Sequence, residues 1–266
     1  MPTYYFREAF ESLEPFHEVV YIDADESSPY VPSTPSELKL TEYLGSPRSL
    51  ATHVADIEVL VVQGAPVTAE LLATAPELRL VGCARGGPVN VDLDAIDARG
   101  LPLVNTPGKN SEAVADLTLA FMVILARGIP EAARFLEAGN QLKDNWEGAR
   151  FMGRDLSGQT LGLVGYGMVG HRVAHRARPF GMEVLVYDPY VQVADAEQTD
   201  SLPELLARAD FVSLHARASS ANEHMIDAAA IAGMRPRAFL INTARDSLVD
   251  EAALDQALAG TGSIPA

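Results

Sequence analysis

Cysteine is almost absent from the sequence, which contains Cys83 and no other. A single thiol cannot close a disulfide within the chain, so an internal disulfide framework is excluded and a reducing compartment is favoured. A chain of 266 residues is long enough to bury two hydrophobic cores of ordinary size. We therefore expect a two-domain cytoplasmic protein.

Long apolar runs are also lacking. The longest extends from Leu117 to Ala126, about half of the roughly 20 apolar residues that a helix needs to cross a bilayer. No signal peptide is recognisable at the start of the sequence. We expect no membrane association, and we interpret the run as the centre of a buried helix.

Basic residues are scarce, because 20 lysines and arginines face 36 aspartates and glutamates, a net charge of −16. The average field of such a chain repels polyanions, so we expect no nucleic acid partner. A small anionic substrate is still compatible with a site that is locally basic.

Glycines cluster where the apolar run Leu161–Val164 gives way to Gly165-Tyr166-Gly167-Met168-Val169-Gly170. The pattern predicts a strand, a tight turn and a helix. Gly165 would let the chain turn, Gly167 would let the backbone approach a pyrophosphate, and Gly170 would let the helix pack closely. The phosphates would lie at the helix N-terminus, at Met168 and Val169, where N–H groups and the helix dipole attract anions.

An acidic residue follows at the distance that a dinucleotide fold requires. Residues 183–188 form a second apolar segment that ends in Asp188, 21 residues after Gly167. In such folds a carboxylate at this place accepts hydrogen bonds from the adenosine ribose hydroxyls. The alternative interpretation is an ordinary surface aspartate in a strand-to-loop turn.

The first part of the chain alternates between strand and helix patterns. Strands are expected at 19–23, 57–62, 78–81 and 102–105, and helices at 68–72, with Thr68 as N-cap, and at 93–98. The proline-rich residues 24–36 are expected to form a loop. This alternation predicts a small parallel α/β domain.

A long helix is predicted next, capped by Asn110 or Ser111 and ending before Gly128. Its centre is apolar nearly all round, so most of its surface must be covered. We expect it between the two domains or in a subunit contact, which suggests a homodimer formed through residues 111–127.

Past Asp188 the pattern continues with a helix at 202–207, strands at 211–215 and 238–244, and a helix capped by Asp250. In an open parallel sheet the ligand lies beyond the carboxyl ends of the strands. The residues expected to line one crevice with the glycine turn are therefore His215, Ala216, Thr243, Ala244 and Arg245.

Seven segments occur together in a recognisable order: Arg85–Asp92, Val104–Gly108, Ala113–Asp116, Gly165–Gly170, Tyr187–Tyr190, Asn242–Arg245 and Leu248–Glu251. They resemble the D-isomer-specific 2-hydroxyacid dehydrogenases, and the resemblance covers nearly the whole chain. It implies α/β architecture in two doubly wound parallel-sheet domains. Residues 1–107 would form a flavodoxin-like substrate domain, and residues 108–266 a Rossmann NAD-binding domain.

The resemblance also implies hydride transfer between C2 of a D-2-hydroxy acid and C4 of the nicotinamide of NAD. Arg245 matches the family arginine. A guanidinium stays protonated, can bind a carboxylate or carbonyl oxygen in a fixed planar geometry, and stabilises the negative charge that develops during reduction. The alternative for Arg245 is a solvated loop arginine. No metal site is expected.

The backbone N–H groups of Gly86 and Gly87 would bind the substrate carboxylate, since glycine lets the backbone approach. Arg85 would either add charge to that pocket or lie along the surface with its stem packed, and both alternatives stay open. We interpret His215 as structural, at a strand end whose backbone contacts the cofactor. The other histidines are interpreted as surface residues: His17, His53, His171, His175 and His224.

Three hypotheses from different classes stay open at this point. The first is an NAD-dependent D-2-hydroxyacid dehydrogenase. The second is an NAD-binding regulator similar to the transcriptional corepressors built on the same fold, which rests on fold analogy alone. The third replaces NAD by an S-adenosyl ligand, but it would leave Arg245 and the Gly86-Gly87 loop without a purpose.

The sequence also departs from the family pattern. The family has a glutamate and then a histidine, its proton-transfer pair, beyond the last predicted helix, whereas only residues 261–266 follow that helix and no histidine follows His224. We expect that the Rossmann domain lacks its last strand or strands, that the first domain lacks a return segment, and that the natural chain continues. Asp246 stands where the family usually has glycine, and Ala216-Arg217 where proline is common.

The first prediction is that residues 1–266 alone bind NAD at most. Arg245 is protonated at ordinary pH and cannot act as a base. Purified protein assayed against a panel of 2-hydroxy and 2-oxo acids should show no turnover. A rate near ~10 s⁻¹, ordinary for an enzyme, would identify a residue interpreted as structural, His215 first, as the base.

Overall fold

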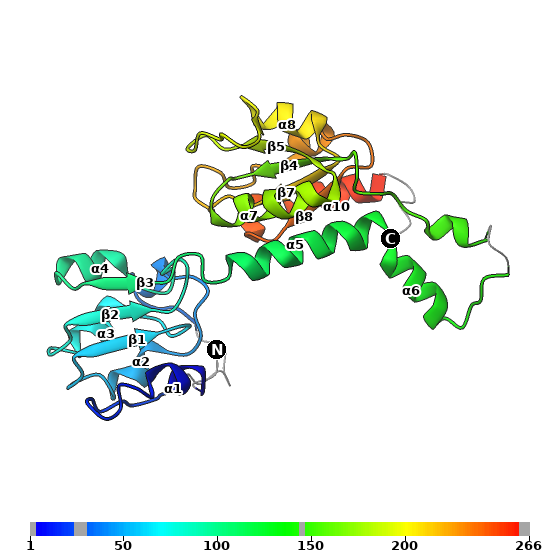
Figure 1. The fold of residues 1–266 in the computed structure, drawn as a ribbon. Helices are drawn as coiled ribbons and strands as arrows, with labels where there is room; N and C mark the ends of the chain where they lie inside the picture. The colour runs from blue at the N-terminus through cyan, green and yellow to red at the C-terminus, as the bar shows by residue number, and fades with distance from the viewer. Residues whose placement is uncertain (1–3, 24–30, 144–146, 261–266) are drawn as a thin grey trace. The chain divides into compact units, whose positions relative to one another are not determined.

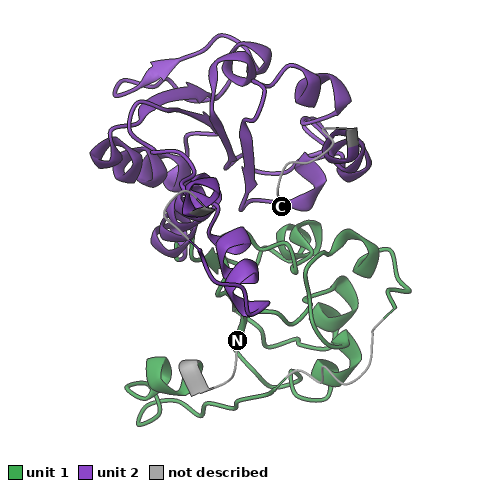
Figure 2. Cartoon of the chain, turned by 90° about the vertical axis from the view of Figure 1, so that its right-hand side faces the viewer, with its two compact units in different colours: residues 1–109 green, residues 110–266 purple. Residues whose placement is uncertain are grey.

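The computed structural model describes residues 4–23, 31–143 and 147–260. The chain divides into two compact units, residues 1–109 and residues 110–266 (Figures 1 and 2). This division falls two residues after the boundary expected at 107. Residues 24–30 of the expected loop, and the residues from 261 onward, lie outside the described residues.

The first unit is built on a three-stranded parallel sheet in the order β1-β2-β3, with β1 at Val59–Val62, β2 at Leu80–Cys83 and β3 at Leu103–Asn105. Around it lie α1 (Tyr4–Phe10), the 3-10 turn η1 (Glu37–Lys39), α2 (Pro47–Ala51), α3 (Ala69–Ala73) and α4 (Leu93–Ala98). As predicted, Thr68 caps α3, with its hydroxyl 3.1 Å from the Leu71 nitrogen. Asp92 caps α4 in the same way.

The strand expected at residues 19–23 is wrong, because these residues form no strand. β-Branched and aromatic residues favoured a strand, but the backbone of residues 19–23 pairs with no strand of the sheet. Instead, the Tyr21 hydroxyl donates to Glu14, and the Arg7 guanidinium of α1 lies 4.3 Å from the centre of the Tyr21 ring. Contact with the N-terminal helix therefore replaces strand pairing.

The second unit contains a five-stranded parallel sheet in the order β6-β5-β4-β7-β8. This is the order of a doubly wound dinucleotide-binding sheet, with β4 in the centre. The strands are β4 (Thr160–Val164), β5 (Glu183–Tyr187), β6 (Glu197–Gln198), β7 (Phe211–Leu214) and β8 (Phe239–Asn242). The fold class predicted for this half is confirmed.

Helices cover both faces of this sheet (Figure 1). One hydrophobic cluster joins α5 (Ser111–Ala126) and α7 (Met168–Ala177) to Leu161 and Leu163 of β4, and another packs the second face against α8 (Leu202–Arg208). Both faces of β4 are therefore buried, as its unbroken apolar sequence predicts. The remaining elements are α6 (Ile129–Glu137), η2 (Glu147–Phe151), η3 (Arg178–Phe180), α9 (Ala228–Ala232), η4 (Asp246–Leu248) and α10 (Glu251–Gly260).

Helix α5 is the long apolar helix predicted from the sequence. It buries Ala115, Leu119 and Met122. Its opposite face leaves three large apolar side chains 38–47% exposed: Leu117, Phe121 and Leu125. The expectation that most of its surface is covered therefore does not hold within the described part of this chain.

Two arginines of α7 join it to α5. Arg172 and Arg176 each donate to one oxygen of the Glu112 carboxylate, at 2.5 and 2.6 Å, and Arg176 also donates to Asp116 at 2.7 Å.

Among the described residues, no single helix is long and apolar enough to span a membrane, and α5 and α6 satisfy that criterion only as a pair bent by 64°.

Candidate active site

The carboxyl ends of four strands lie level along one edge of the second sheet. The residue pairs Val164 with Tyr187, Val164 with Leu214, and Leu214 with Asn242 are in register. The residues that come next along each strand are therefore neighbours at that edge: Asp188, Gly165, His215 and Thr243. The structure brings the predicted cofactor residues of the second unit together at the point where the strand order reverses.

The three glycines of the turn have different surroundings. Gly165 has a φ of +96°, and a Cβ on it would lie 2.8 Å from both the Ala216 nitrogen and the His215 carbonyl carbon. A Cβ on Gly170 would lie 2.2 Å from the Gly165 oxygen, whereas one on Gly167 would have no neighbour within 4 Å. The fold itself requires Gly165 and Gly170, while Gly167 borders open space.

Helix α7 starts beside that space. Gly167 is its N-cap residue, and no side chain of the described residues caps the helix there. The N–H groups of its first turn, at Met168 and Val169, therefore have no partner within the helix. This arrangement fits a bound pyrophosphate, because the N–H groups and the helix dipole attract an anion without needing a side chain.

The Asp188 carboxylate is fixed at the end of β5. One oxygen accepts from the Tyr166 nitrogen at 2.8 Å and the other from the Tyr190 nitrogen at 2.9 Å. The Gln198 amide donates to the Asp188 carbonyl at 2.9 Å. The half-buried carboxylate is thus oriented next to the glycine turn, where ribose hydroxyls of a dinucleotide would meet it.

His215 follows β7 and is part-buried. Its Nε2 lies 2.9 Å from the Ser213 hydroxyl of the same strand. Burial penalises the charged imidazolium and lowers the pKa of His215 from 6.5 to about 4, so the ring is neutral at pH 7. The neutral ring is thus bonded to its own strand.

Arg245 lies in an exposed turn after β8. The side chain of Asn242 spans this turn, since its amide nitrogen donates to the Arg245 carbonyl at 2.7 Å and its oxygen accepts from the Ala244 nitrogen at 3.0 Å. The hydroxyl of Thr243 lies 3.2 Å from that of the fully buried Thr118 in α5. The resemblance includes Asn242 but assigns it no role, although an amide at the end of a strand is a signal for a side-chain-closed turn.

Asp246 begins η4 without a positive φ, and its carboxylate accepts from the Ser247 nitrogen at 2.8 Å. The departure from the usual glycine therefore causes no backbone strain.

In the first unit, the predicted substrate loop follows β2. Arg85 is part-buried and donates to both the carbonyl and the carboxylate of Glu42, so its charge is paired within the first unit. A Cβ on Gly86 or Gly87 would meet other atoms only at 3.9–4.0 Å. The fold does not require glycine there.

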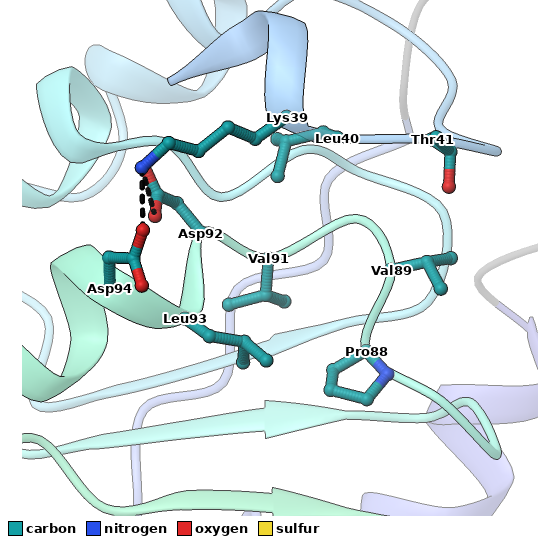
Figure 3. A pocket seen from close by; sticks show the side chains of 9 residues that line it. All are labelled: Lys39, Leu40, Thr41, Pro88, Val89, Val91, Asp92, Leu93 and Asp94. Atoms are coloured by element: carbon teal, nitrogen blue, oxygen red, sulfur yellow. Dashed lines mark hydrogen bonds and ion pairs between the residues drawn. The ribbon is translucent and has the colours of Figure 1, made fainter. Parts of the chain in front are cut away.

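A cavity of about 260 Å³ also lies in the first unit (Figure 3). Lys39 bridges its acidic side, with its amine 2.7 Å from Asp94 and 3.8 Å from Asp92. Pro88 and Val89 line it, but none of the predicted site residues does.

Among the described residues, no group of histidine, cysteine, aspartate and glutamate side chains could hold a metal ion.

The sheet order, the glycine turn after its central strand and the acid after the next strand define a dinucleotide-binding domain of the Rossmann type. Comparison with known proteins identifies the family. The model of the D-isomer specific 2-hydroxyacid dehydrogenase NAD binding domain matches residues 119–263, and that of the catalytic domain matches residues 19–178. The chain belongs to the D-isomer-specific 2-hydroxyacid dehydrogenase family, and its NAD-binding domain argues against the S-adenosyl hypothesis.

Individual relatives agree with this family assignment. The chain is 39% identical over 215 residues to D-3-phosphoglycerate dehydrogenase of Methanocaldococcus jannaschii, covering 79% of this chain and 40% of that protein. It is 35% identical over 221 residues to hydroxypyruvate reductase of Thermotoga maritima, covering 82% and 70%. A solved structure of D-lactate dehydrogenase from Aquifex aeolicus with NAD and lactic acid superimposes with a TM-score of 0.76 at 27% identity, covering 98% and 72%. The chain thus spans about 40% of the length of the phosphoglycerate dehydrogenases that it matches.

The glycine turn yields a prediction that uses two matched variants. Gly170→Ala should lower the free energy of unfolding by about 2 kcal/mol, because its Cβ would overlap backbone. Gly167→Ala should change it by less than about 0.5 kcal/mol but weaken NADH binding. Urea unfolding and NADH titration measure the two effects, and equal destabilisation by both variants would contradict the assignment.

Asp188 generates a prediction about cofactor choice. Its carboxylate would repel a 2′-phosphate, and residues 189–198 contain no arginine or lysine to bind one. NADPH should therefore bind at least about tenfold, or ~1.4 kcal/mol, more weakly than NADH. Calorimetry measures both affinities, and Asp188→Ser should narrow the gap. Equal affinity of the unmodified protein for both would exclude this function of Asp188.

His215 generates a prediction about acid stability. Between pH 6.5 and 4 the unfolded chain binds the His215 proton and the folded protein does not, so stability is present above 6.5 and is lost as the pH falls toward 4. The loss should reach up to about 3 kcal/mol. His215→Gln should remove this share of the pH dependence of urea unfolding, whereas His53→Gln, at an exposed site, should not. Parallel curves for all three proteins would exclude the lowered pKa.

Proposed function

We propose that the protein transfers hydride between C4 of the nicotinamide of NAD and C2 of a D-2-hydroxy acid or its 2-oxo form. The observation that supports this most strongly is the shared edge of the second sheet. There, a helix N-terminus open to phosphate, an oriented carboxylate and Arg245 follow strands β4, β5 and β8 of one parallel sheet.

Each group has a physical task in this proposal. The turn at Gly165–Gly170 binds the pyrophosphate through backbone N–H groups, and Asp188 accepts from the adenosine ribose. Arg245 binds the substrate carboxylate or carbonyl oxygen and stabilises the negative charge that develops on that oxygen as hydride arrives. The N–H groups of Gly86 and Gly87 bind the substrate carboxylate. NAD supplies the hydride chemistry when bound.

The substrate is a small anionic 2-hydroxy or 2-oxo acid. The relatives are named for phosphoglycerate, hydroxypyruvate and lactate, which share that chemical class and differ in the rest of the substrate molecule.

The exposed side chains Leu117, Phe121 and Leu125 support a homodimer formed through α5, since a soluble protein rarely leaves such an apolar face uncovered. The low cysteine content supports a cytoplasmic location.

The alternative of an NAD-binding regulator without turnover has no specific observation in its favour. A regulator would bind NADH through the same turn but would not need Arg245 to bind an anion. The experiment that follows therefore distinguishes it from an enzyme.

In a complete enzyme, Arg245→Ala should lower kcat/KM for a 2-oxo acid by about a hundredfold or more, because a charge-assisted contact that strengthens in the transition state is lost. Arg245→Lys keeps the charge but loses the planar fork, so it should recover only part of the loss. Binding of oxalate by the NADH complex gives the same comparison without turnover, and NADH affinity should be unchanged. Kinetics and oxalate affinity within about threefold of the unmodified protein would exclude Arg245 from the site.

A further inference from the structure

Tyr166, between the first two glycines of the turn, has a side chain that the cofactor site does not explain. The residue is only 7% exposed, and its ring packs into the hydrophobic cluster between the sheet and α7. A side chain that served only to fill this core would need no polar atom. The Tyr166 hydroxyl nevertheless lies 2.9 and 3.0 Å from the two carboxylate oxygens of Asp195.

Asp195 belongs to the loop that leads from Asp188 to β6. Arg178 in η3 donates to the Asp195 carboxylate at 3.0 Å and to the Asp195 carbonyl at 2.5 Å. The Nε2 atom of His171 lies 3.9 Å from the same carboxylate. The hydrogen bond from Tyr166 is the main cause that lowers the pKa of Asp195. Burial raises the pKa of Tyr166, so the phenol keeps its proton and acts as the donor.

The start of the same loop is also attached to Tyr166. The Tyr166 nitrogen donates to the Asp188 carboxylate, whose other oxygen accepts from the Tyr190 nitrogen. The Gln198 amide bonds the Asp188 and Val191 carbonyls and accepts from the Val193 nitrogen. Tyr166 therefore contacts both ends of the segment 188–195, one through its backbone and the other through its hydroxyl.

We infer that the Tyr166 hydroxyl is a positioning group for the adenosine half of the dinucleotide. This inference rests on the proposed NAD site. A loop held at both ends before binding loses less conformational entropy when the ligand arrives, and this raises affinity without a new ligand contact. Tyr166 acts through Asp195 and the loop, and it contributes to cofactor binding instead of the chemical step.

The test compares Tyr166→Phe with the unmodified chain. Removing only the hydroxyl should weaken the binding of NADH and of ADP-ribose by the same factor, about tenfold, since a hydrogen bond to a charged partner is lost and both ligands contain the adenosine half. Tyr21→Phe is the matched control, because it removes a 3.0 Å hydroxyl-to-carboxylate bond, to Glu14, in the first unit. It should leave both affinities unchanged.

Asp195→Asn provides a second variant that leaves the hydrophobic core intact, since the Asp195 side chain is 44% exposed. It should weaken the binding of NADH and of ADP-ribose, and the double variant should bind them no more weakly than the weaker of the two single variants, because both substitutions remove the same hydrogen bond. Amide hydrogen exchange should accelerate in residues 189–196 of both variants and stay unchanged in β4 and α7.

The outcomes separate this inference from the proposed function. If the unmodified chain binds neither NADH nor ADP-ribose, the proposed function fails and the inference fails with it. If the unmodified chain binds them and Tyr166→Phe binds them equally well, with or without a loss of thermal stability, the inference alone is overturned and the hydroxyl is only structural.

Discussion

The site depends on the close approach of two strand ends at Gly165. With a φ of +96° and the backbone of residues 215 and 216 at 2.8 Å from a hypothetical Cβ, this position has no room for any side chain. Its nitrogen donates to the Tyr187 carbonyl at 2.9 Å. Its oxygen would lie 2.2 Å from a Cβ on Gly170. A larger residue would separate β4 from β7 and displace both the helix N-terminus and the end of β5. Three parts of the proposed cofactor site therefore depend on the absence of a side chain at Gly165.

The proposed ligands are anions, although the chain has a net charge of −16. The two facts are compatible because the groups that would bind the phosphates and the substrate carboxylate are mostly backbone N–H groups, whose attraction is short in range. Arg85, which could have added positive charge, is paired with Glu42. In the proposed function, Arg245 adds a charged contact to these backbone groups.

The sequence was sufficient to predict the features that depend on local pattern. The glycine turn, the cap at Thr68 and the succession of strands around Asp188 follow from period, spacing and capping chemistry, and they are where those rules put them. The strand at 19–23 failed because propensity cannot tell whether a partner strand is available. Helix α6 was missed because Gly128, at a φ of +59°, ends α5 and is also the N-cap of the next helix.

Contacts between side chains could not be predicted in the same way. The bond between Tyr166 and Asp195 and the turn closed by Asn242 depend on where loops return, and loops have no periodic signature. The family resemblance indicated which segments matter, but not that Arg85 would be paired with Glu42. Hydrogen-bond partners of loop residues needed the folded structure.

The two parts of the proposed site in the second unit differ in how far apart their contacts lie along the chain. The bond between Tyr166 and Asp188 joins residues 22 positions apart, within one strand-helix-strand unit, whereas the turn that bears Arg245 contacts α5 through Thr118 and Thr243, which are 125 positions apart. Closing a short loop costs less chain entropy than closing a long one. The dinucleotide half is therefore built from one contiguous segment, while the turn that bears Arg245 also relies on a contact with a helix far away in the sequence.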